Sequence, residues 1–162
     1  MKKNIITLLI LFSSAFLFAK NLSPEEVKYQ EVLEFPGIEA DVLFEKAKQS
    51  FVNQCHSAKD VIQYSNKEEG KFIGKAWMDV TYSFTPVRTW FVITVDVKNE
   101  KMRITFTDMR MPGVFSNKED ETLFTLKMQL DKFSVKAKKI VETMQKDILA
   151  KVEDDDWLFI IF

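Results

Sequence analysis

Cys55 and His56 are the only cysteine and the only histidine of the chain, and they are neighbours in the sequence. A cysteine activated by a histidine is a nucleophile, but adjacent residues on a helix point about 100° apart, so these side chains cannot easily face one another. A zinc ion would need more nitrogen or sulfur ligands than the chain contains. We therefore expect Cys55 in the core and His56 at a helix end, with no metal and no cofactor.

Carboxylates form a run at Asp154-Asp155-Asp156 near the end of the chain. Calcium prefers carboxylate oxygens, but calcium-binding loops interleave them with other residues and a turn glycine, which this run lacks. A solvated terminus is therefore the expectation. Three more aspartates lie on predicted strands, where nothing in the sequence brings two of them together: Asp79, Asp96 and Asp108.

Catalysis is not predicted by any triad, dyad or metal motif in the sequence. The alternative is an enzyme whose site is assembled from scattered polar residues. Its candidates are Lys75, Tyr82, Arg103 and Asp108.

Apolar residues interrupt the polar faces of two neighbouring predicted strands, and they include Trp77 and Trp90. Aromatic residues on a polar face can mark a binding surface, or they can stabilise a sheet by cross-strand packing. Our hypothesis is that this face, or a groove between it and the C-terminal tail, binds an envelope protein, a peptide or a small apolar ligand. The candidate residues are Lys71, Ile73, Lys75, Trp77, Trp90, Val92 and Arg103.

The elements that must position this face begin with an alternating strand over Tyr29–Phe35, which ends at Pro36-Gly37. A three- and four-residue apolar period then predicts an amphipathic helix over Glu39–Cys55. A strand over Asp60–Ser65 follows it, and the turn that comes next ends at Gly70, which can adopt a positive φ.

Two long strands and a hairpin follow. Even-numbered apolar residues predict a strand over Phe72–Phe84, and after the connection Thr85–Arg88 the odd-numbered residues from Phe91 to Val97 share the core face. A two-residue hairpin loop is expected next, with Asn99 in the left-handed conformation. In the last predicted strand Met102, Ile104, Phe106 and Asp108 share one face.

A long helix closes the predicted fold. Asn117 can cap it, acidic residues fill its first turn, and its apolar stripe runs from Leu126 to Val152, with a break near Asp131 as an option. The order β-α-β-β-β-β-α predicts an α+β two-layer sandwich, with an antiparallel sheet and two helices on one face. The 15 Phe residues supply the core.

The N-terminal residues 1–19 are predicted to be a cleaved signal peptide, because Lys2 and Lys3 precede an apolar run that ends at Ala19. An uncleaved anchor is the alternative, but the run is shorter than the roughly 18 apolar residues that span a bilayer. We expect export to the periplasm, the cell envelope or the medium, with no transmembrane segment in the mature chain. A flexible linker, 20–27, would precede one domain, 28–157.

The mature chain is mildly acidic. All 24 acidic residues and 21 of the 23 basic ones lie beyond Ala19, so the net charge there is −3. Nucleic-acid binding usually needs a basic surplus, so no nucleic acid is expected as a partner. The apolar tail Leu158–Phe162 could add a strand to the sheet edge, insert into a partner or serve as a terminal address.

The stretch Ala58–Lys75, and above all Ile62-Gln63 through Gly74-Lys75, resembles the hairpin signature of a family of exported bacterial proteins. That family is described as a domain of unknown function with a fold like the TATA-box-binding protein (TBP-like). Val32–Gly37 and Asp155-Asp156-Trp157 are similar to it as well. The resemblance implies a curved antiparallel sheet backed by two helices, and it implies no catalytic residue.

Overall fold

The computed structural model describes residues 22–54, 62–82, 84–112, 121–125 and 127–158. The predicted signal peptide 1–19, the Cys55-His56 pair and tail residues 159–162 lie outside these ranges. Among the helices that are described, none is both long and apolar enough to cross a bilayer.

The centre of the fold is one antiparallel sheet, whose main path has the strand order β1-β5-β4-β3-β2. Its strands are β1 (Tyr29–Glu34), β2 (Ile62–Asn66), β3 (Lys71–Tyr82), β4 (Thr85–Lys98) and β5 (Lys101–Pro112). A sixth short strand, β6 (Glu121–Leu123), pairs with the far end of β5. Consecutive strands β2 to β5 are joined by tight turns and therefore pair as antiparallel hairpins.

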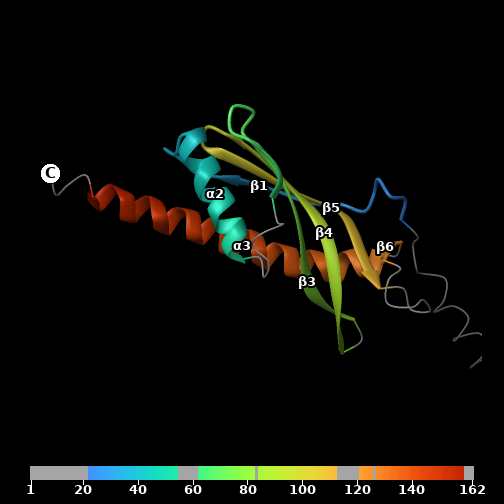
Figure 1. Ribbon diagram of the computed structural model, residues 1–162. Coiled ribbons are helices and arrows are strands. Elements are labelled where there is room, and N and C mark those ends of the chain that lie inside the picture. The colour runs from blue at the N-terminus through green and yellow to red at the C-terminus, as the bar shows by residue number, and fades with distance from the viewer. Residues whose placement is uncertain (1–21, 55–61, 83, 113–120, 126, 159–162) are drawn as a thin grey trace, which may run out of the picture.

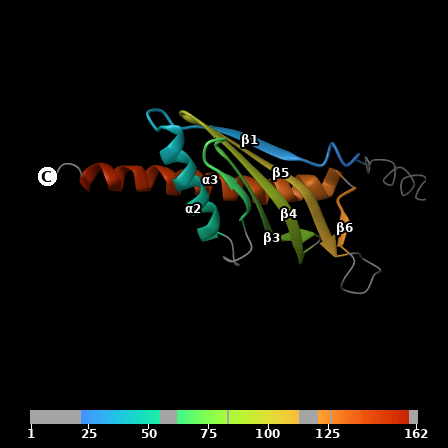
Figure 2. The ribbon, with the colours of Figure 1, turned by 45° about the horizontal axis from the view of Figure 1, so that its top comes forward.

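Two helices, α2 (Ala40–Gln54) and α3 (Lys127–Leu158), lie on the same side of the sheet (Figure 1). The turned view shows the same layering, with α2 crossing α3 (Figure 2). They touch through a hydrogen bond from Ser50 Oγ to Asp147 Oδ2, 3.0 Å long. The predicted α+β two-layer sandwich is therefore confirmed.

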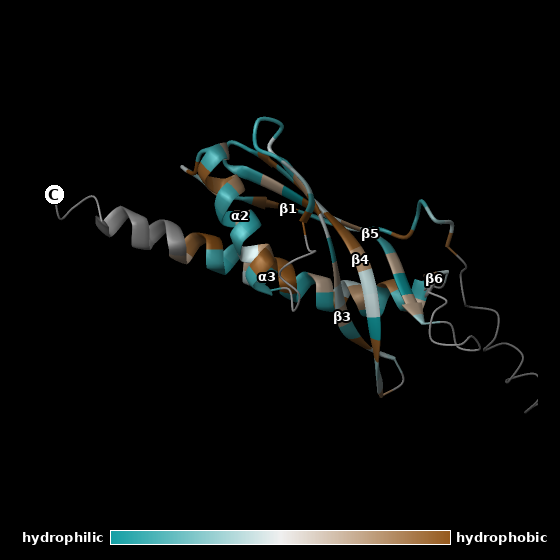
Figure 3. Ribbon diagram, viewed as in Figure 1, coloured by the Kyte–Doolittle hydropathy of each residue, from teal (hydrophilic) through white to brown (hydrophobic). Residues whose placement is uncertain are grey.

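The core between the layers is largely aromatic. Phe133 of α3 is fully buried, and its ring centroid lies 5.6 Å from that of Phe91, 5.8 Å from that of Phe106 and 6.0 Å from that of Phe124. Apolar and polar residues alternate along the strands (Figure 3), so one face of the sheet meets the helices and the other meets solvent.

A bulge in β5 changes which of its residues faces the core, in comparison with the prediction from the sequence. Trp90 pairs with Arg110 but Val92 pairs with Thr107, so β5 has an extra residue at this point. Asp108 adopts a φ of 49° there, and Met109, with no exposed surface, occupies the core position. The prediction that Asp108 shares the core face was wrong, because a bulge shifts the alternation of side chains by one residue.

The two turns that flank β4 also differ from prediction. Thr85 pairs with Tyr82, so Thr85–Arg88 belong to β4 instead of a connection, and Phe84 at this turn has a φ of 73°. In the turn between β4 and β5 the positive φ, 63°, belongs to Glu100 and not to Asn99. The Asn99 Oδ1 atom instead accepts a 3.0 Å hydrogen bond from the Ala40 amide at the start of α2.

The final helix begins later than predicted. Glu121–Leu123 are extended against β5, and Phe124 is buried, so α3 starts at Lys127 and not near Asn117. The helix is continuous through Asp131 and includes the acidic run Glu153–Asp156, which was expected as a solvated terminus.

The expected linker is held against the domain over its described part. The Leu22 amide donates a 2.8 Å hydrogen bond to the Thr125 carbonyl, and Val27 is buried. Leu22 is therefore bound to the segment between β6 and α3, and Val27 belongs to the core.

Candidate functional site

The candidate site is the outer face of the sheet, which we define as the face opposite α2 and α3. The alternation of β3, β4 and β5 places all seven predicted residues on it. They are Lys71, Ile73, Lys75, Trp77, Trp90, Val92 and Arg103. Lys75 and Arg103 are exposed, and the other five are half-buried against their neighbours.

Trp77 and Trp90 form the centre of this face. They lie directly opposite one another on β3 and β4. The guanidinium carbon of Arg88 lies 4.0 Å from the centroid of the Trp77 ring, which is a cation–π contact. Arg88 is in turn opposite Asp79. Strand pairing therefore places the two indoles side by side, and the Arg88 guanidinium stacks on that of Trp77.

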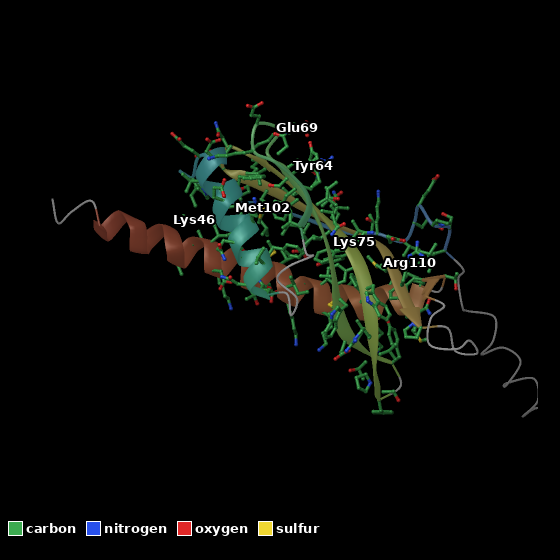
Figure 4. The ribbon with its side chains drawn as sticks, in the orientation of Figure 1. Lys46, Tyr64, Glu69, Lys75, Met102 and Arg110 are labelled. Atoms are coloured by element: carbon green, nitrogen blue, oxygen red, sulfur yellow. The ribbon has the colours of Figure 1, made fainter. Side chains whose placement is uncertain are left out.

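Apolar residues extend this centre in both directions. Val92 lies opposite Lys75, and Ile73 lies opposite Tyr64 of β2, whose hydroxyl donates to Glu69 Oε2 at 2.8 Å (Figure 4). Leu123 of β6 lies opposite Arg110 and is 40% exposed. We call the six residues the apolar band: Tyr64, Ile73, Trp77, Trp90, Val92 and Leu123.

Sequence reasoning missed two members of the apolar band, for different reasons. Leu123 was assigned to a helix, and only its pairing with β5 reveals its face. Tyr64 is two residues after core-directed Ile62, so regular alternation would place both side chains on the core face. Only the register shift between them in β2 puts Tyr64 opposite Ile73 on the outer face.

The charges around the apolar band are mainly positive. Five basic side chains stand on this part of the sheet with three acidic ones among them, and Glu69 adds a fourth carboxylate beside Tyr64. The basic residues are Lys71, Lys75, Arg88, Arg103 and Arg110, and the aspartates are Asp79, Asp96 and Asp108. Arg103 Nη2 lies 2.9 Å from Asp96 Oδ2, and Arg110 Nε lies 2.9 Å from Asp108 Oδ1. This basic surplus contrasts with the net charge of −3 over residues 20–162.

The four candidates for a catalytic site are not brought together. Arg103 pairs with Asp96, and Asp108 pairs with Arg110. Tyr82 packs on the helix side of the sheet, where its ring meets Phe124 edge-on at 6.5 Å, whereas Lys75 is on the outer face. Within the described ranges, no group of three His, Cys, Asp or Glu side chains could hold a metal ion.

A shallow hollow of about 330 Å³ lies beside α2, away from the candidate face. Its lining includes Asp41, Glu45 and Lys67, and Lys67 Nζ lies 3.4 Å from the Asp41 carboxylate and 3.9 Å from that of Glu45. Surface ion pairs of this kind contribute little to stability, and their mutual pairing leaves the hollow without a preference for a charged ligand.

Tyr82 gives a pH-dependent prediction. Its hydroxyl is buried and has no hydrogen-bond partner in the described part of the chain, and burial raises the pKa of Tyr82 to about 12. Thr89 opposes this rise, although its own hydroxyl donates to the Val87 carbonyl at 3.3 Å. Because the unfolded tyrosine ionises at about 10, the unfolded state holds fewer protons between about pH 10 and 12, and stability should fall through that window.

Tyr82→Phe should retain or raise the free energy of unfolding at neutral pH, by up to about 1 kcal/mol, because it removes an unsatisfied buried oxygen. It should also lose less stability than the wild type as the pH rises through the same window. Urea denaturation at neutral and alkaline pH measures both effects. Identical alkaline losses in the two proteins would contradict this account of Tyr82.

The sheet, its two helices and the open outer face define a TBP-like α+β domain. Residues 29–111 match the family described as "Domain of unknown function (DUF4468) with TBP-like fold", and the chain belongs to this family. The resemblance noted in the sequence is thereby confirmed. No significant match was found among curated proteins.

Solved structures that are similar to this chain include the following two. A TBP-like protein from Parabacteroides distasonis ATCC 8503 is 8% identical with a TM-score of 0.63, and the match covers 80% of this chain and 97% of that one. This likeness shows the fold alone. A DUF4468 family protein from Bacteroides ovatus ATCC 8483 is 16% identical with a TM-score of 0.49, over 76% and 84% of the two chains.

Proposed function

We propose that this chain is an exported, non-catalytic binding domain whose outer face recognises a protein or peptide partner in the cell envelope. The observation that carries the proposal is the directly opposed pair Trp77–Trp90, which stands on the sheet face that the helices leave open. Tryptophan and arginine are the residues most enriched at binding hot spots, and here Arg88 stacks on Trp77.

Export is the part of the proposal that rests on sequence. Lys2 and Lys3, the apolar run and Ala19 follow the pattern of a cleaved signal peptide. A small apolar ligand fits this site less well than a peptide, because ligand pockets are concave and bury most of a small molecule. An extended or helical peptide can instead lie across an open apolar band bordered by charges.

Trp77→Ala and Trp90→Ala test this proposal directly. Each should weaken partner binding roughly 30-fold, the effect of truncating a hot-spot tryptophan. The fold should survive, because cross-strand pairs contribute only about 0.2 to 1 kcal/mol. The measurement is affinity capture by the mature protein from the envelope of the organism that encodes it, with circular dichroism as the check on folding.

Val135→Ala is the matched control, since Val135 is 63% exposed on α3, in the helical layer. It removes exposed apolar surface without touching the outer face, and capture should be unchanged. If both tryptophan variants fold and capture the same partner as strongly as the wild type, the outer face is not the binding surface.

A further inference from the structure

Helix α3 carries its C-terminal end away from the domain. The last of its described core residues is Ile148, and the helix continues to Leu158, which adds roughly 15 Å at 1.5 Å per residue. Figures 1 and 2 both show this end extending past α2 and past the sheet. The segment is therefore placed to meet another molecule.

The chemistry of this segment is distinctive. Four consecutive acidic residues, Glu153 to Asp156, are followed by Trp157 and then by the apolar residues 158–162. Within ten residues the chain thus combines a compact negative charge with a continuous apolar stretch. A surface that binds it should combine an apolar strip with neighbouring cations.

The outer face has this combination. Its apolar band is bordered by the five basic side chains described above, and their surplus over the acidic ones is the reverse of the charge on the segment. Lys75, opposite Val92 at the middle of the band, is exposed and has no ion pair among the residues that are described. Complementary charge of this kind guides encounter and selects the partner.

The segment cannot easily reach the outer face of its own molecule. Both helices lie on the other side of the sheet, and the acidic residues are part of α3, so they cannot turn back without breaking the helix. The geometry therefore favours contact between two copies.

We propose that Glu153–Phe162 of one copy docks on the outer face of a second copy. This inference rests on the proposed role of the outer face as a binding surface, and it names the occupant. The contact is heterologous, since a face meets a tail, so a bound pair retains one free face on one copy and one free tail on the other. Head-to-tail assembly into rings or filaments follows.

Sedimentation velocity of the full mature chain, residues 20–162, tests the assembly. The average mass should rise with protein concentration and fall with added salt, because the acidic run contributes through screened charges. Lys75→Glu should weaken self-association roughly tenfold or more. Lys136→Glu is the matched control, an equal charge change at an exposed position on α3, and should leave the mass unchanged.

Mixing two blocked variants gives the sharper result. One carries Lys75→Glu with Trp90→Ala and retains its tail; the other lacks residues 158–162 and retains its face. Each should be monomeric alone, whereas an equimolar mixture should form a dimer and nothing larger. Asp154→Asn with Asp155→Asn replaces the deletion if the shortened chain does not fold.

Three outcomes overturn the inference: a wild type that stays monomeric, a mixture that does not pair although the wild type assembles, or a tail deletion that destabilises the isolated monomer, which would indicate docking within one molecule. The proposed function fails separately. If the wild type is monomeric, yet envelope capture is lost in Trp90→Ala and unchanged by the tail deletion, the outer face binds a different protein and only the self-assembly is wrong.

Discussion

Phe133→Ala should lower the free energy of unfolding by about 3 to 5 kcal/mol, the usual cost of emptying a buried phenylalanine site. Phe133 has no exposed surface, and its ring meets Phe91 of β4, Phe106 of β5 and Phe124, the residue after β6. These edge-to-face contacts add to the hydrophobic term. The substitution should therefore weaken the attachment of α3 to the sheet.

Phe84→Ala is the matched control, because Phe84 is fully exposed at the turn between β3 and β4. It removes the same atoms from a solvent-exposed position instead of from the core, so the free energy of unfolding should change by no more than about 0.5 kcal/mol. Urea denaturation followed by circular dichroism measures both variants. Equal losses at the two positions would show that Phe133 is not the aromatic centre of the core.

Gly70→Ala should lower the free energy of unfolding by about 2 to 4 kcal/mol, since it combines a strained conformation with a steric clash. Gly70 has a φ of 61°, and a Cβ atom there would lie 2.3 Å from the carbonyl oxygen of Val97. That oxygen belongs to the backbone of β4, which cannot move aside cheaply. The Val97 amide also donates to the Gly70 carbonyl at 2.6 Å, so a shift would disturb this hydrogen bond.

Gly37→Ala separates the two causes. Gly37 has a similar φ of 78°, but a Cβ atom there would meet nothing within 4 Å. Gly37→Ala should therefore lower the free energy of unfolding by about 1 kcal/mol, through conformational strain alone. The difference between the two variants in urea denaturation measures the clash at Val97, and a larger loss at Gly37 than at Gly70 would contradict it.

The core residues also matter for the binding proposal, because β4 contributes side chains both to the core and to the outer face. Phe91 and Ile93 of β4 face the helices, while Trp90 and Val92, which alternate with them, lie on the outer face. The packing beneath the sheet therefore holds the strands that carry the apolar band in register. Variants in the core should reduce binding in proportion to unfolding, whereas variants of Trp77 or Trp90 should reduce it in a folded protein.

The order of elements followed from the sequence because it depends on local periodicity. Two-residue alternation in Phe72–Val80 and Phe91–Val97 predicted strands with one core face, and the three- and four-residue period predicted both helices. The same alternation placed Trp77, Trp90 and Val92 on the outer face before any contact was known. Short turns then required neighbouring strands to pair antiparallel.

What tertiary structure alone decided depends on contacts between residues far apart in the sequence. The bulge at Asp108 puts Met109 in the core in place of Asp108, and it appears only in the pairing of β5 with β4, whose register shifts between Val92–Thr107 and Trp90–Arg110. Leu123 joins the apolar band only through its pairing with β5. The apolar period along one strand indicates which side of the sheet a residue faces. Which residues meet across two strands depends on the register, and the register is set by packing of the whole sheet against its helices.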